Sequence, residues 1–285
     1  MGIYIAAAIT TALVLGLYGY VIAKMSARAD WPVLIVAALV ALPLQPLAFY
    51  LVRMPLHGFL SASLGAGALL TTLTLFYAPL TEEPAKWLPL LVPFIRRRLN
   101  PANAVAMALA VGLGFGIGEI WFLAEQLARV PAVAAQPFYS LGGFLIERTL
   151  VCFLHGAMIA FAYHRLASGR SFILGGLIGM ALHFALNFPI FLAGIDLFGL
   201  GKTWWPTLLM LYLGLFTIAL GAAVTSLSRG RFREVVLGFS DCPECGAHYP
   251  RPLLALNFGP VRYERCPNCR RFHWVSITSG RARPP

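Results

Sequence analysis

The sequence predicts an all-α polytopic membrane helical bundle followed by a small C-terminal domain of β structure. Two features of composition point to the bundle: 59% of the 285 residues are hydrophobic, and only 12% are charged. Soluble globular proteins usually carry about 25% charged residues. The β domain is predicted from a change of character after residue 228, where the chain becomes polar and basic and has no apolar run long enough to cross a bilayer.

Eight apolar stretches are candidates for membrane segments, and most reach the roughly 20 residues that a helix needs to cross the hydrocarbon core. The stretch at 83–95 is shorter, so we expect a short, tilted or re-entrant piece there. The first stretch lacks the basic start of a signal peptide and is expected to remain as a membrane helix. The stretches cover residues 3–23, 32–52, 58–80, 83–95, 101–124, 138–163, 171–193 and 204–228.

Basic residues next to these stretches predict the orientation of the chain. Arginine clusters at 96–98, 165–170 and 229–233 mark cytoplasmic ends and place the C-terminal tail in the cytoplasm. Lys24 and Arg28 favour a single crossing of residues 58–95, whereas Arg53 favours two, so seven and eight spans both stay open. We expect an integral protein of the inner cell membrane, whose pI of about 9.9 reflects basic residues near anionic lipid more than nucleic-acid binding.

Several polar residues lie inside the apolar stretches. A charged group at the centre of a membrane helix costs about 2.5–3.5 kcal/mol on insertion scales, so a chain that carries several must pair them or use them. Such residues are too many here to be incidental. The set comprises Glu82, Glu83, Lys86, Glu119, Glu147, Arg148, His155, His183 and Asn187.

The stretch "LTEEPAKWLPLLVPF", residues 80–94, places two adjacent glutamates in an apolar run. Glu82 and Lys86 are four apart, so on a helix they share a face and are expected to pair. Glu83 points about 100° away. Pro84 fits the first turn of a helix, which predicts a helix N-terminus here. A capping role explains one glutamate at that end but not two, so we favour a functional role.

The stretch "GLGFGIGEIWF", residues 112–122, carries four alternating glycines before Glu119. Small residues let helices approach closely in lipid, so the glycines predict tight packing. Glu119 is then either satisfied by a neighbouring helix or part of a site, and we favour the site.

Two further stretches carry histidines. Arg148 and His155 are seven apart and nearly on one face, and Glu147 is expected to pair with Arg148 or with another helix. His183 and Asn187 share a face at four residues apart. A lone membrane histidine is more often a satisfied core residue, but together with paired carboxylates these groups match the inventory of a water-activating hydrolytic site.

These motifs together resemble the PrsW family, a branch of the CAAX-protease and bacteriocin-processing superfamily of intramembrane proteases. The resemblance lies in "EEPAK", in "FGIGE" with Phe115-x-x-x-Glu119, in "ER" ahead of His155, and in "HFALN". It covers roughly residues 60–195. The glutamate form of the second motif is the PrsW-like one, where related proteases have histidine.

The resemblance implies an endopeptidase that hydrolyses a membrane-anchored protein. Glu82 or Glu83 would activate the water, His155 and His183 would hold a metal or polarise that water, and Asn187 would stabilise the oxyanion. Glu119 would be a ligand or a second base, while Lys86, Glu147 and Arg148 would be supporting residues. A catalytic metal, if the reaction uses one, is implied at His155, His183, Glu82 and Glu119, and the sequence leaves a metal-free mechanism equally open.

The tail carries "CPEC" and "CPNC" with twenty residues between them. This C-x2-C-x20-C-x2-C spacing is close to the four-cysteine zinc pattern, and a cytoplasmic location would keep the thiols reduced. We therefore predict a structural zinc ribbon over 241–278, after a basic linker at 229–240 and before a flexible tail at 279–285. The expected ligands are Cys242, Cys245, Cys266 and Cys269.

The role of the ribbon is open at this point. A basic-aromatic cluster at 262–274 could meet nucleic acid, but tethering at a membrane favours docking or regulation with a cytoplasmic protein partner. For the whole chain, the competing hypotheses are a non-enzymatic transporter or proton relay that uses the same polar residues, and a scaffold that presents the ribbon. No convincing internal repeat supports a transporter.

Overall fold

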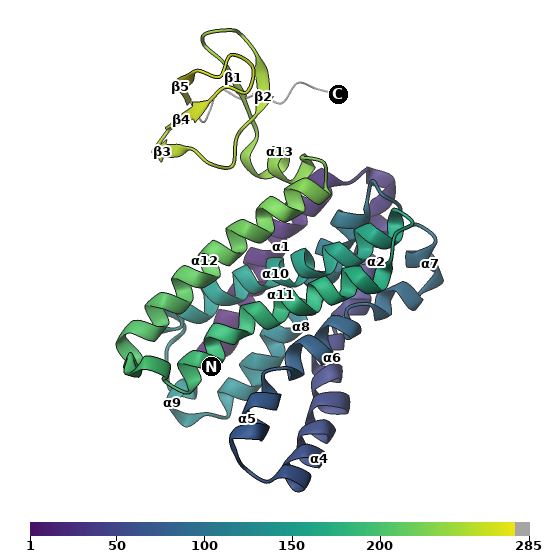
Figure 1. The fold of residues 1–285 in the computed structure, drawn as a ribbon, viewed down its shortest axis with the longest axis vertical. Coiled ribbons are helices and arrows are strands. Elements are labelled where there is room, and N and C mark those ends of the chain that lie inside the picture. Colours follow the sequence, from purple (N-terminus) through teal and green to yellow (C-terminus); the bar gives the residue numbers. More distant parts are fainter. Residues whose placement is uncertain (277–285) are drawn as a thin grey trace. The chain divides into compact units, whose positions relative to one another are not determined.

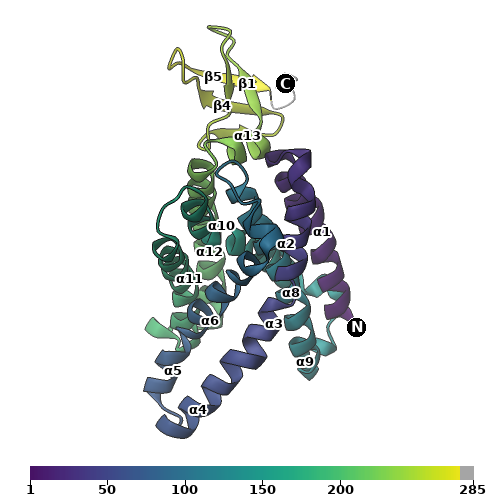
Figure 2. The same cartoon turned by 90° about the vertical axis from the view of Figure 1, so that its right-hand side faces the viewer.

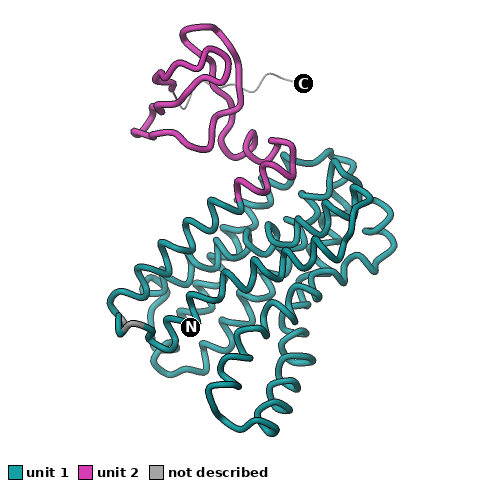
Figure 3. Tube along the Cα trace, in the orientation of Figure 1, with its two compact units in different colours: residues 1–220 teal, residues 221–285 magenta. Residues whose placement is uncertain are grey.

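The computed structural model describes residues 1–276, apart from the side chains of Phe198 and Lys202. The predicted tail at 279–285 and the last two residues of the predicted ribbon lie outside the described residues. The chain divides into two compact units, residues 1–220 and 221–285 (Figure 3). Unit 1 is helical and unit 2 holds all the described strands, so the predicted fold class is confirmed. The predicted domain boundary at 228/229 stays a prediction.

Unit 1 contains five long helices and a set of shorter ones (Figure 1). The long helices are α1 (Gly2–Met25), α8 (Ala104–Ala128), α10 (Gly142–Ala167), α11 (Phe172–Gly194) and α12 (Gly201–Leu227), which runs into unit 2. The shorter ones are α2 (Trp31–Ala41), α3 (Leu44–Ala48), α4 (Met54–Leu64), α5 (Ala68–Thr74), α6 (Tyr77–Ala85), α7 (Pro93–Arg96) and α9 (Pro131–Ala134). A π-helical turn, Phe49–Arg53, joins α3 to α4, and 3-10 turns cover Arg28–Asp30, Leu88–Leu91, Phe138–Ser140 and Leu197–Gly199.

Six helical segments within residues 1–276 are long and apolar enough to cross a membrane. The predicted stretches at 58–80 and 83–95 are not among them, because each is divided between shorter helices. Gly65 ends α4 with a φ of 69°, and the prolines at 84, 89 and 93 interrupt the helix that follows. The number of crossings stays a prediction. The six segments are Gly2–Met25, Arg28–Leu64, Ala104–Ala128, Gly142–Ala167, Phe172–Gly194 and Thr203–Leu227.

Helix α8 lies at the centre of unit 1. It packs against α1, α2, α3 and α10, and Figure 2 shows α1 and α2 running alongside it. A Cβ at Gly112 would overlap the backbone of Gly156 in α10, and a Cβ at Gly114 would overlap that of Ala38 in α2. One turn later, a Cβ at Gly116 would overlap Cys152 of α10, and a Cβ at Gly118 would overlap the backbone of Leu42, directly after α2. Residues two apart lie on opposite sides of a helix, so alternating glycines let α8 approach a helix on each side. The predicted close packing is confirmed.

Unit 2 is built from one short helix and two small antiparallel sheets. One sheet pairs β1 (Phe239–Asp241) with β2 (His248–Pro250), and the other has the order β3 (Leu256–Phe258), β4 (Val261–Arg265), β5 (Phe272–Ser276). Helix α13 (Arg231–Leu237) occupies most of the predicted basic linker. The four cysteines lie in the turns next to β1, β2, β4 and β5.

Candidate functional site

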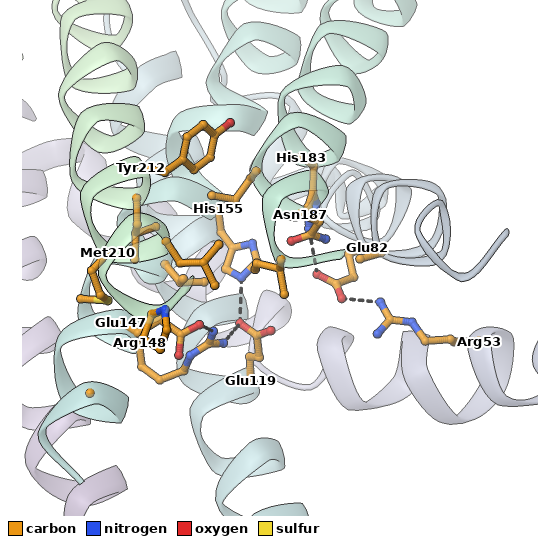
Figure 4. A pocket seen from close by; sticks show the side chains of 18 residues that line it. Arg53, Glu82, Glu119, Glu147, Arg148, His155, His183, Asn187, Met210 and Tyr212 are labelled. Atoms are coloured by element: carbon orange, nitrogen blue, oxygen red, sulfur yellow. Dashed lines mark hydrogen bonds and ion pairs between the residues drawn. The ribbon is translucent and has the colours of Figure 1, made fainter. Parts of the chain in front are cut away.

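Most of the polar motif residues of unit 1 line one cavity of about 530 Å³ (Figure 4). Four helices and the π-helical turn contribute its polar residues: α6, α8, α10 and α11 carry the predicted ones. The remaining lining comes largely from apolar side chains of α10, α11 and α12. The charged, histidine and amide lining residues are Arg53, Glu82, Glu119, Glu147, Arg148, His155, His183 and Asn187.

The two adjacent glutamates lie at the C-terminal end of α6. The prediction that they open a helix is therefore wrong: α6 begins at Tyr77 and ends at Ala85, one residue after Pro84. The proline has no N–H to continue the hydrogen-bond ladder, so it stops the helix within a turn. Carboxylates at a helix C-terminus are disfavoured by the helix dipole, which increases their need for cationic partners.

The cationic partners of the two glutamates differ from the predicted ones. Lys86 Nζ lies 2.6 Å from Glu83 Oε1 and does not pair with Glu82. The side chains of Lys86 and Glu83 are both fully buried. The helix tightens at its end, where Trp87 N–H donates to the Pro84 carbonyl, and such a turn brings residues three apart together. Glu82 Oε1 instead accepts a hydrogen bond of 2.5 Å from Arg53 Nη2.

Glu83 also fixes the orientation of His183. Its Oε1 lies 2.7 Å from His183 Nδ1, and because a carboxylate only accepts, Nδ1 is the donor. His183 Nε2 then lies 3.8 Å from Glu82 Oε2. Among the described residues that line the cavity, Glu82 is present and Glu83 is absent. Glu82 therefore faces the cavity, whereas Glu83 lies outside the cavity lining and orients His183.

Glu119 contacts both Arg148 and His155, which lie on α10. Its Oε2 lies 2.9 Å from Arg148 Nη1 and 2.9 Å from His155 Nε2. Glu147 lies 2.5 Å from Arg148 Nη2, which is the local pairing that the sequence allowed. Phe115, at the start of the same motif, packs its ring against His155 with centroids 5.0 Å apart. The expectation that Arg148 and His155 share a face is confirmed, since both contact one carboxylate.

Three of these residues could hold a metal ion. Ligand atoms of Glu82, Glu119 and His155 all lie within 4.8 Å of one another. His155 Nδ1 is buried and has no hydrogen-bond partner among the described residues. Two carboxylates and an imidazole are ligands that zinc accepts, and three protein ligands leave a position for water. The donor set therefore fits a catalytic metal. His183, the fourth implied ligand, lies outside this group.

Arg53 is a charged cavity residue that the sequence motifs do not identify. It was interpreted as a marker of topology, whereas in the structure it ends the π-helical turn and bonds both Glu82 and, at 3.4 Å, Thr81 Oγ1. Turns of this kind occur frequently at functional sites. A signal was present in the sequence: Arg53 is the lone Asp, Glu, Lys or Arg between Asp30 and Glu82.

The cysteines of unit 2 form a second group. Their ligand atoms lie within 4.8 Å of one another, with Sγ–Sγ distances of 3.7 Å for Cys242–Cys269 and 3.8 Å for Cys245–Cys266. Four thiolates about 2.3 Å from one tetrahedral zinc ion would be about 3.8 Å apart. Hydrogen bonds from the Asn268 side chain and from the Ala247 backbone lower the pKa of Cys245 to about 6, which favours the thiolate. The group can bind a metal ion.

The two histidines of unit 2 are not members of this group, although His273 Nδ1 lies 4.0 Å from Cys242 Sγ. His248 Nδ1 lies 2.7 Å from Asp241, and His273 Nε2 lies 2.8 Å from the Tyr249 hydroxyl. The predicted basic-aromatic cluster at 262–274 is also divided between two faces, because Arg262 and His273 are buried while Phe272 and Trp274 are exposed.

Comparison with known proteins adds a family to this geometry. A family model described as "PrsW family intramembrane metalloprotease" matches residues 28–223, which include every polar residue of the cavity. No curated protein and no solved structure shows a significant match.

Proposed function

The chain belongs to the PrsW family of intramembrane proteases, and from that premise we propose that it cleaves a membrane-anchored protein with a water molecule activated by Glu82. The observation that carries this proposal is the different placement of the two adjacent glutamates. Glu82 lines the cavity, whereas Glu83 is buried against Lys86 and His183. Of the two, Glu82 is the carboxylate that a substrate and a water molecule can reach.

Glu82 would act as the general base. A positioned carboxylate that takes a proton in the transition state contributes about 10²–10⁴-fold to the rate. His183 Nε2, 3.8 Å from Glu82 Oε2, would hold the same water or receive its proton. Glu83 supports this role, because its hydrogen bond to Nδ1 leaves Nε2 of the neutral ring as an acceptor.

Two further residues of the cavity would bind the peptide group. Asn187 is one helical turn beyond His183 and lines the cavity, so its amide would donate to the oxyanion that forms on the attacked carbonyl. His155 would contact the substrate from α10, held in place by Glu119 and Arg148. Apolar side chains of α11 and α12 form the rest of the cavity wall. The Tyr212 hydroxyl of α12 donates a 2.8 Å hydrogen bond to the Ala185 carbonyl of α11. Such a wall suits an apolar segment of a membrane protein.

A catalytic metal would be held by Glu82, Glu119 and His155, in which case Glu82 would be a ligand and His183 Nε2 would receive the proton of the water. When bound, such an ion would polarise the peptide carbonyl and lower the pKa of the attacking water. Loss of cleavage in Glu82→Gln is expected with or without a metal.

The cysteine group of unit 2 would hold a structural zinc ion, and unit 2 would be a cytoplasmic zinc ribbon with a docking or regulatory role. The Sγ–Sγ distances of 3.7 and 3.8 Å support this proposal. The tail would then lie on the cytoplasmic side of the inner membrane, where thiols stay reduced.

The test compares the membrane proteomes of cells that express the wild type, Glu82→Gln or Glu125→Gln. Glu125 is the matched control, since it is an exposed glutamate on α8 paired with Arg129. We expect at least one membrane-anchored protein to accumulate at full length, and its fragment to disappear, with Glu82→Gln alone. If all three proteins are equally abundant in the membrane and leave the same fragments, the proposal is wrong.

A further inference from the structure

The outer face of the three-stranded sheet in unit 2 is apolar and exposed. In β4, Arg262 and Glu264 point to the interior, so Val261, Tyr263 and Arg265 point outward. Antiparallel partners lie on the same face, and the register pairs these three with residues of β3 and β5. The outward partners are Leu256, Phe258, Phe272, Trp274 and Ser276. We call these eight outward residues the outer sheet face.

The apolar members of the outer sheet face form one continuous surface. Phe258, Phe272 and Trp274 are 57%, 60% and 52% exposed. The ring of Trp274 contacts those of Tyr263 and Phe258, with centroids 4.9 and 5.5 Å apart. The water-facing side of a small sheet is normally polar, and a contiguous apolar patch marks a binding surface.

We infer that the outer sheet face binds the surface of an anionic lipid bilayer. This interaction goes beyond the proposed protease activity and does not depend on it. Tryptophan and tyrosine are the side chains that gather at the boundary between lipid and water. The aliphatic members, Leu256 and Val261, favour lipid over a nucleic acid, whose bases would stack on aromatic rings.

Charge supports the same partner. The outer sheet face carries Arg265 and no carboxylate, because Glu264 points to the interior. Over residues 229–276 the chain has eight arginines against four acidic residues. Arginines near an anionic membrane surface contribute favourably to binding.

The connection to the membrane makes the interaction easy to form. Only residues 228–238 separate the end of α12 from β1. Eleven residues reach about 40 Å at most, so unit 2 stays close to the bilayer that α12 enters. A short tether turns the binding into an intramolecular event, and a weak affinity is then sufficient.

The test measures backbone hydrogen exchange of the full chain in nanodiscs, either of phosphatidylcholine alone or with phosphatidylglycerol added. We expect slower exchange in residues 256–276 in the anionic nanodiscs, because binding to the folded form alone slows opening. The protection should disappear at high salt, and Arg265→Gln should lower the bound-to-free ratio about fivefold.

Trp274→Ser should remove the lipid-dependent protection, and Val236→Ser is the matched control, since Val236 is an exposed apolar residue of α13 outside the outer sheet face. Equal metal content of the variants would show that the fold of unit 2 is kept. Exchange that is the same in both lipids would overturn the inference. If exchange is equally slow in both lipids, a protein surface covers the outer sheet face. If exchange is equally fast in both lipids, the outer sheet face is uncovered.

Discussion

Among the described residues, two groups of side chains could hold a metal ion, and they are built in opposite ways. The cysteine group of unit 2 comes from two short turns, and each turn supplies two ligands within four residues. The carboxylate–histidine group of unit 1 draws one side chain each from α6, α8 and α10, and its supporting residues extend from Arg53 to Asn187. Its charges are held in place by other charges: Arg53 for Glu82, and Arg148 for Glu119.

The difference shows what each site depends on. Local turns determine the cysteine geometry, so that group depends on little else in the fold. The group in unit 1 exists only when five separate parts of the bundle are packed correctly. Buried charges also need their partners, because a buried ion without one is strongly destabilising.

The largest expected effect is loss of the ribbon fold when its metal site is broken. A structural zinc ion in a small domain contributes on the order of 10–16 kcal/mol to folding. We therefore expect Cys242→Ser, or a strong chelator, to unfold residues 239–276 while the amides of α8 stay protected from exchange. Cys152→Ser is the control, since Cys152 is a buried cysteine of α10 outside the group. Retention of the ribbon fold without metal would contradict the assignment.

A smaller effect is expected from packing around α8. Gly114→Ala places a Cβ against the backbone of α2, and overpacking of this kind costs about 1–3 kcal/mol. We expect a lower melting temperature of unit 1, reduced cleavage and an unchanged ribbon. Gly16→Ala in α1 is the matched control, because a Cβ there meets nothing within 4 Å. Equal melting temperatures for the two variants would show that the close approach of α8 and α2 is unimportant.

The smallest effect concerns the position of Glu82. Arg53→Gln removes the cation that holds this carboxylate, and we expect cleavage to fall about tenfold, which corresponds to ~1.4 kcal/mol. The melting temperature should fall as well, because the Glu82 side chain is only 5% exposed and loses its cationic partner. Arg129→Gln is the control, as an exposed arginine that also pairs with a glutamate. An unchanged cleavage rate for Arg53→Gln would mean that Glu82 is positioned without it.

The same difference, local turns against distant helices, decides how well each group can be predicted from the sequence. The cysteine pattern is local, so its spacing alone was sufficient to predict that the four thiols meet. The sequence predicts most residues of the unit 1 site because polar residues within a motif are spaced so that they share one face of a helix. The shared face of Arg148 and His155 follows from this spacing.

The partners within the unit 1 site could not be predicted in the same way. Lys86 was assigned to Glu82 on the assumption of a continuous helix, but Pro84 ends α6 and the tighter turn selects Glu83. Arg53 lies in a π-helical turn that no local sequence pattern predicts. Which glutamate faces the cavity depends on how α6 is rotated against α11, and that is decided by packing between distant segments.

The most direct test of the account measures cleavage and thermal stability of Glu82→Gln and Glu83→Gln side by side in reconstituted membranes. Glu82→Gln should lose about 10²–10⁴-fold in cleavage rate while its melting temperature stays near that of the wild type. Glu83→Gln should lower the melting temperature clearly, because it leaves Lys86 buried without its carboxylate, a change that costs about 3–5 kcal/mol. A stable Glu83→Gln protein without cleavage, together with an active Glu82→Gln protein, would contradict the account and assign the base to Glu83.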